Sequence, residues 1–155
     1  RYGRARRLAL FGTPPRGEPV DEEALRVCHP PNPSASELAA SLTGAFSTAF
    51  LAGQPDTVER ICRWRKNEDA GPDGFEAQLR AATAFDSGPL HERTLPALVC
   101  HGLDDPVVDA DAGRTLADDL PQGTFEPVEG RRLCHVEHAR AVADRLDGFL
   151  SAEDR

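Results

Sequence analysis

The stretch "LPALVCHGLDDPVV", residues 95–108, decides the fold because it joins an apolar run to a turn that carries two acidic side chains. A short apolar run of this kind predicts an interior strand of a parallel sheet that is covered on both faces. His101 and Gly102 follow the run, and Asp104 and Asp105 come directly after them. Ligands bind beyond the carboxyl ends of the strands in open parallel sheets. We therefore expect a functional site at these acids.

Strands and helices alternate on either side of this stretch. Apolar runs predict strands at residues 8–11, 97–101 and 124–128, and apolar side chains at helical spacing predict helices at 110–120 and 136–151. Strands that alternate with helices form parallel sheets with right-handed crossovers. The sequence therefore predicts an α/β fold with a partial parallel sheet.

Residues 21–88 contain no strand pattern and are expected to form helices separated by glycine and proline. Ser34 and Glu37 have the spacing of a capping box, which predicts the start of a helix. Asp56 and Asp73 predict the starts of two more. Behind the capping box an apolar residue recurs at every fourth position, which predicts one continuous helix with an apolar stripe. The stripe consists of Leu38, Leu42, Phe46 and Phe50.

The composition excludes several classes of partner. The chain has 155 residues, 39% of them hydrophobic and 28% charged, and it carries a formal net charge of −8. A length of this order suits one compact soluble domain. The negative charge argues against binding to nucleic acid or to an anionic membrane. No apolar run approaches the ~20 residues that a membrane-spanning helix needs.

The cysteines and the short motifs predict neither a metal nor a cofactor. The four cysteines lie far apart with no C-x-x-C pair, so we expect buried thiols in a reducing, cytoplasmic compartment. "CHVEH", residues 134–138, contains soft ligands, but adjacent side chains point in different directions, so no metal site is expected there. The absence of a G-x-G-x-x-G motif and of a P-loop argues against a nucleotide or a flavin.

A histidine-containing loop follows the next predicted strand, at the same edge of the sheet. This loop, "EGRRLCHVEH" at residues 129–138, contains His135 and His138. An acid after one strand and a histidine after the next form the later two-thirds of a Ser…Asp…His order. The carboxylate would orient the imidazole, which would act as a general base. The alternative is that Asp104 and Asp105 only close a β-to-α turn.

These motifs resemble the C-terminal part of the α/β-hydrolase fold family. The resemblance lies in "LPALVCHGLDDPVVDADAGRTLADDLP" and "GRRLCHVEHARAVADRLDGFL". It implies a core formed by residues 1–20 and 91–155 and a helical cap formed by residues 21–90. It also implies hydrolysis of a small ester or related carbonyl substrate through a Ser-His-Asp triad without a cofactor. Asp105 would be the acid of that triad.

The chain departs from the family pattern at the nucleophile, because it contains no G-x-S-x-G motif. The resemblance therefore implies that the serine lies outside this chain, which would be the second half of a hydrolase. The isolated chain is then expected to be inactive. A complementary N-terminal half or a second copy of the chain is expected to pair with the strand at residues 8–11.

The chain departs from the pattern a second time at the base. In the family a Gly-His pair is followed by a second histidine and a glutamate, and "CHVEH" aligns His135 and Glu137 with those two. The base position then falls on Arg132, or on Leu133 when counted from Asp105. Either His135, or less favourably His138, acts as the base, or the base is lost. The loss would leave an inactive binding or interaction domain, and a freestanding α/β interaction domain is a third reading.

Overall fold

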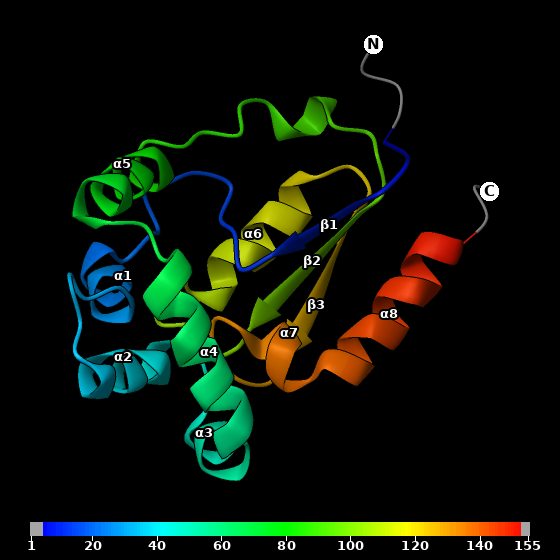
Figure 1. Cartoon of the computed structure of the whole chain (residues 1–155). Coiled ribbons are helices and arrows are strands. Elements are labelled where there is room, and N and C mark those ends of the chain that lie inside the picture. Colours follow the sequence, from blue (N-terminus) through cyan, green and yellow to red (C-terminus); the bar gives the residue numbers. More distant parts are fainter. Residues whose placement is uncertain (1–4, 153–155) are drawn as a thin grey trace.

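The computed structural model describes residues 5–152, and its centre is a parallel three-stranded sheet (Figure 1). The strands are β1 (Leu8–Phe11), β2 (Ala97–Gly102) and β3 (Gly123–Val128), in the order β1-β2-β3. Ala97 lies opposite Leu8 on one side and opposite Gly123 on the other. All three strands therefore end at the same edge, and the predicted α/β fold with a partial parallel sheet is confirmed.

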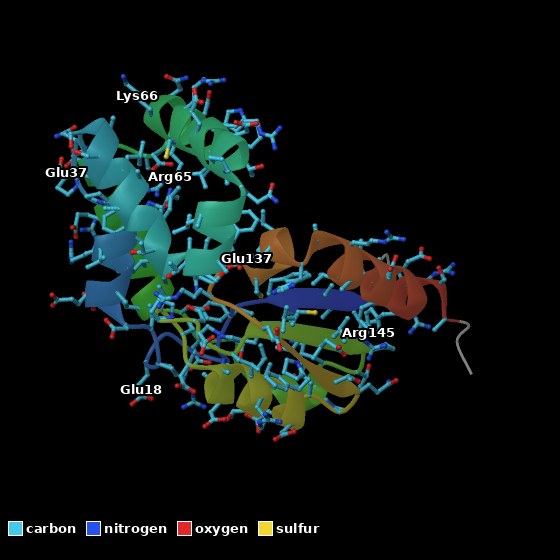
Figure 2. The ribbon with its side chains drawn as sticks, turned by 90° about the horizontal axis from the view of Figure 1, so that it is seen from below. Glu18, Glu37, Arg65, Lys66, Glu137 and Arg145 are labelled. Carbon is cyan, nitrogen blue, oxygen red and sulfur yellow. The ribbon has the colours of Figure 1, made fainter. Side chains whose placement is uncertain are left out.

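The helices form two groups. The first group contains α1 (Glu22–Cys28), α2 (Ala35–Ser41), α3 (Thr48–Gly53), α4 (Pro55–Glu68) and α5 (Pro72–Thr83). The second contains α6 (Ala110–Asp119), α7 (Cys134–Glu137) and α8 (Ala139–Ser151). Short 3-10 helices occur at Leu42–Gly44 and Leu90–Glu92. Figure 2 shows the sheet between α6 and α8, with the first group gathered to one side. No helix among residues 5–152 is both long enough and apolar enough to cross a membrane.

The core lies around β2, whose six residues are all buried. On one face the alternate residues Ala97 and Val99 pack against α6. The α6 residues of this cluster are Leu116 and Ala117, followed by Leu120. Replacement of a buried leucine by alanine in such a core costs ~2–5 kcal/mol of stability. Residues of β1 and β3 pack on the same cluster, so this core holds the three strands side by side.

The prediction of one continuous helix behind Ser34 is wrong. The capping box at Ser34 is present, but α2 ends at Ser41 and α3 begins only at Thr48. A Cβ placed on Gly44 would lie 2.4 Å from the Sγ atom of Cys28, so the chain turns there to pack closely on α1. The Ser47 side chain then caps α3. Tertiary packing thus overrides the four-residue spacing of the apolar side chains.

The last predicted helix is also divided, because α7 ends at Glu137 and α8 begins at Ala139. The four cysteines are free thiols, and the prediction that they are buried is wrong for Cys62. Cys28, Cys100 and Cys134 are buried, whereas Cys62 is half-buried. The division of the chain into a core (1–20 and 91–155) and a cap (21–90) stays a prediction, as does the cytoplasmic location.

Candidate functional site

Asp105 lies in the turn after β2, with its side chain fully buried. Its Oδ1 atom accepts hydrogen bonds from the backbone amides of Val107, at 2.9 Å, and Val108, at 3.3 Å. Its neighbour Asp104 is exposed. Of the two acids, only Asp105 is therefore directed inward, and its role as the acid of a triad stays a prediction. A buried carboxylate needs such donors, because an unpaired charge in the interior is costly.

Arg132 provides the charged partner of this carboxylate. Its Nη1 atom lies 3.2 Å from Oδ2 of Asp105 and donates a second hydrogen bond, at 3.3 Å, to the carbonyl oxygen of Gly12. Gly12 directly follows β1 and has a φ of +52°, which a residue with a Cβ rarely adopts. The loops after β1, β2 and β3 thus meet at one ion pair.

His101 at the end of β2 is a site residue that sequence reasoning missed. Its ring is fully buried, and its Nε2 atom lies 2.8 Å from the carbonyl oxygen of Val108 and 3.6 Å from Oδ2 of Asp105. A Cβ on Gly113 would lie 2.2 Å from Nδ1 of His101, so α6 packs directly on the ring. No local pattern indicates this contact, because a four-residue spacing brings side chains together on a helix, whereas His101 lies in a strand.

The surroundings of Asp105 hold it in its charged form. Burial alone would raise the pKa of Asp105. The nearby His101 ring, the Val107 and Val108 amides and the positive charge of Arg132 together outweigh burial, and they hold the pKa of Asp105 below its ordinary value. The carboxylate is therefore ionised near neutral pH and offers a fixed negative charge at the end of the sheet.

His135, the predicted base, lies in α7 with its ring packed on Phe11, at 5.2 Å between ring centroids. Its Nδ1 atom is buried and has no hydrogen-bond partner among the described residues. Burial lowers the pKa of His135, so its imidazole is neutral at pH 7. The structure brings Arg132 into contact with Asp105, whereas the described hydrogen bonds of Asp105 do not include His135.

Four hydrogen bonds join the loop that carries Arg132 to the segment between α2 and α3. The Ser47 amide donates to Oε1 of Glu137 at 2.7 Å, and the Ser47 hydroxyl donates to Oε2 at 2.6 Å. The Leu133 amide donates to Ala45, and Arg131 donates to the Thr43 carbonyl oxygen. Figure 2 shows Glu137 where α7 meets the first group of helices. That group is therefore attached to the loop that positions Arg132.

We expect Glu137→Ala to lower the free energy of unfolding by about 2 kcal/mol, because hydrogen bonds to a charged acceptor contribute about 1.5–3 kcal/mol in folded proteins. Urea unfolding monitored by circular dichroism measures the change. Glu129→Ala is the matched control, since Glu129 lies exposed in the same loop, and it should change stability by no more than about 0.5 kcal/mol. Equal effects of the two variants would show that Ser47 and Glu137 do not hold the helices together.

Comparison with known proteins agrees with this architecture. No family model matches the chain. The chain is 24% identical over 106 residues to 3-oxoadipate enol-lactonase 2 from Acinetobacter baylyi, and the match covers 68% of this chain and 39% of that protein. The matched part of the chain thus spans well under half the length of this curated relative.

Two solved structures resemble the whole described fold. One is the enol-lactonase from Burkholderia xenovorans LB400, with a TM-score of 0.77 and 22% identity, over 96% of this chain and 57% of that one. The other is a hydrolase from Pseudomonas aeruginosa, with a TM-score of 0.73 and 25% identity, over 95% of this chain and 56% of that one. The chain therefore has the fold of the α/β-hydrolase family, as the sequence resemblance implied, and it corresponds to little more than half of these structures.

Proposed function

We propose that this chain is the cap and C-terminal part of an α/β-hydrolase-fold protein that binds a small ester, lactone or carboxylate without cleaving it by a Ser-His-Asp triad. The observation that carries the proposal is the contact between Arg132 and Asp105. By the resemblance to the family, the position of the catalytic histidine falls on Leu133 or on Arg132. Here the Nη1 atom of Arg132 lies 3.2 Å from the acid that would orient that histidine.

A guanidinium cannot replace an imidazole as a base. Arginine stays protonated at any pH at which the protein is folded, so it donates hydrogen bonds and accepts no proton. Arg132 uses Nη1 for Asp105 and for Gly12, and it remains about one-third exposed. A guanidinium that is partly open to solvent suits a carbonyl or carboxylate oxygen of a bound molecule. Arg132 would thus prevent hydrolysis by a triad and favour the binding of a carbonyl or carboxylate group.

The test is hydrolysis of p-nitrophenyl acetate together with labelling by a fluorophosphonate probe. We expect no nitrophenol release above a heat-denatured control and no labelled serine, both in this chain and in any longer protein that contains it. A burst of nitrophenol together with a labelled serine would contradict the proposal. If Arg132→Gln left that activity intact while His135→Ala abolished it, His135 would be the base.

Hydrolysis with His135 as the base and Asp105 as the acid is the second candidate. The unpartnered Nδ1 atom of His135 and its lowered pKa favour it, because a general base must be neutral and free to accept a proton. This reading requires a serine from outside the chain. It also requires that the loop at residues 129–138 shift so that His135 replaces Arg132 beside Asp105.

We also propose that a further strand pairs with β1. Within residues 5–152, β1 lies at the edge of the sheet and pairs only with β2. Unpaired edges promote association with other chains. An N-terminal half of the same protein or a second copy of the chain would fill this edge. A monodisperse monomer in light scattering, with cooperative unfolding, would instead favour the freestanding interaction domain.

A further inference from the structure

A cavity of about 960 Å³ opens within the first group of helices, and neither Asp105 nor Arg132 lines it. Its walls come from the connection between α1 and α2, from α4, and from the beginning of α5. Figure 2 shows this end of the molecule, with Arg65 inside the group and Lys66 at its outer end. Cavities of about 300–1,000 Å³ whose walls are mostly apolar and carry a few polar groups are typical of small-molecule sites.

The apolar part of the wall contains an aromatic pair. The rings of His29 and Phe75 lie 5.5 Å apart between centroids, at an interplanar angle of 31°. The remaining apolar side chains of the wall include Pro30, Pro31, Pro33, Ala35 and Leu38. Aromatic rings pack on one another in offset or edge-to-face arrangements, so this wall suits the ring of a ligand.

The charged side chains of the wall are paired, with one exception. The ion pairs are Arg26–Glu76, Arg63–Glu59 and Arg65–Asp69. Arg65 is held in addition by the Ser41 hydroxyl and the Cys28 carbonyl oxygen. Lys66 has no counter-ion among the cavity residues.

The cavity therefore has a net charge of one positive unit. Burial, together with the nearby Arg65, lowers the pKa of His29, so its ring is neutral at pH 7 and adds no charge. The four cationic side chains of the wall face three carboxylates, although the chain as a whole carries a net charge of −8. A single unpaired cation beside an apolar wall is complementary to a ligand that has one negative charge and an apolar body.

We propose that this cavity binds a small aromatic carboxylate, with its ring against His29 and Phe75 and its carboxylate at Lys66. The site is separate from the Arg132–Asp105 pair, so this proposal does not depend on the function proposed above. It adds a second ligand site, formed by the helical group alone.

Cys62 allows the proposal to be tested at the cavity itself. It lines the cavity and is half-buried, whereas the other three cysteines are buried. Burial raises the pKa of Cys28 and Cys134, and it raises the pKa of Cys100 to about 11, so these thiols are poor nucleophiles near neutral pH. N-ethylmaleimide should therefore alkylate Cys62 first, and a ligand in the cavity should slow that reaction.

The experiment measures the alkylation rate of Cys62 by peptide mass spectrometry at increasing concentrations of 2-naphthoate, with neutral 2-naphthamide as the matched probe. We expect 2-naphthoate to protect Cys62, and we expect half-protection to need about two- to fivefold more 2-naphthamide, the factor expected for one exposed ion pair. Lys66→Gln should raise the concentration of 2-naphthoate needed for half-protection by the same factor, and it should leave the concentration of 2-naphthamide needed for half-protection unchanged. Arg140→Gln is the control variant. It removes an exposed positive charge on α8 and should change neither half-protection concentration.

Each protection value is compared with the unliganded rate of the same variant, so an effect of Lys66 on the reactivity of Cys62 cancels. Absence of protection by 2-naphthoate would overturn the proposal. Equal protection by both probes, with no effect of Lys66→Gln, would overturn it as well, because the cavity would then only take up apolar molecules without recognising the charge.

Discussion

Asp105→Ala is expected to lower the free energy of unfolding by about 2–3 kcal/mol, the contribution of hydrogen bonds to a buried charged acceptor; Arg132 is about one-third exposed, so the loss of its counter-ion adds little. The substitution leaves the amides of Val107 and Val108 without their acceptor, and it leaves Arg132 without its counter-ion. Urea unfolding at pH 7 measures the loss. Asp104→Ala is the control, because Asp104 is exposed in the same turn, and it should cost no more than about 0.5 kcal/mol.

The difference between wild type and Asp105→Ala should shrink in acid. The folded protein holds the pKa of Asp105 below its ordinary value, so the stabilisation is complete above the unfolded pKa of about 3.9 and is lost as the pH falls through the folded pKa. Unfolding curves at pH 7, 5 and 3 measure this. A difference that stays constant down to pH 3 would mean that the charge of Asp105 does not stabilise the fold.

Gly102→Ala is expected to lower the free energy of unfolding by about 3 kcal/mol, at the upper end of the cost of overpacking. A Cβ on Gly102 would lie 2.1 Å from the carbonyl oxygen of Arg131 and 2.8 Å from that of Gly130. Both contacts involve backbone, so no change of rotamer relieves them. The loop must move away from β2, and Arg132 must move with it.

The same substitution in α8 provides the control. A Cβ on Gly148 would meet nothing within 4 Å, so Gly148→Ala should stabilise the protein by about 0.5–1 kcal/mol, as glycine-to-alanine changes do in helices. Thermal unfolding of both variants measures the two shifts. If Gly102→Ala were neutral as well, the loop at residues 129–138 would not pack on the end of β2.

The predictability of the fold differs between its two parts. The strands were predicted because each is a short apolar run between turn residues. Helix α6 was predicted because its apolar side chains recur at helical spacing. The helical group was predicted less well, because Leu42 and Phe46 have helical spacing but are buried by a turn at Gly44. Close contact between Gly44 and Cys28, which lie 16 positions apart in the chain, decides this turn. The spacing of apolar residues along one segment does not indicate a contact with a distant segment.

The candidate site was predicted in part for a similar reason. The position after a buried strand indicated both Asp104 and Asp105, because the ligand-binding edge of a sheet lies there, and only the resemblance to the family pointed to Asp105. The resemblance to the family placed the base position at Arg132 or at Leu133. The distance between Arg132 and Asp105 depends on how the loops after β2 and β3 lie against each other, which the resemblance did not predict. The bonds between Ser47 and Glu137 join residues 90 positions apart, and no local pattern indicates them.

The proposed function depends on the contact between the side chain at position 132 and Asp105, in the place of a catalytic base. The most direct test is a histidine side-chain NMR titration of Arg132→His, with and without Asp105→Asn. We expect the imidazole introduced at position 132 to have a pKa about one unit above the ordinary value of about 6.5, because a carboxylate lies beside it. We also expect Asp105→Asn to remove this rise and to leave the pKa of His135 unchanged. If the introduced imidazole titrated at its ordinary pKa while Asp105→Asn shifted the pKa of His135, then His135 and not position 132 would face Asp105.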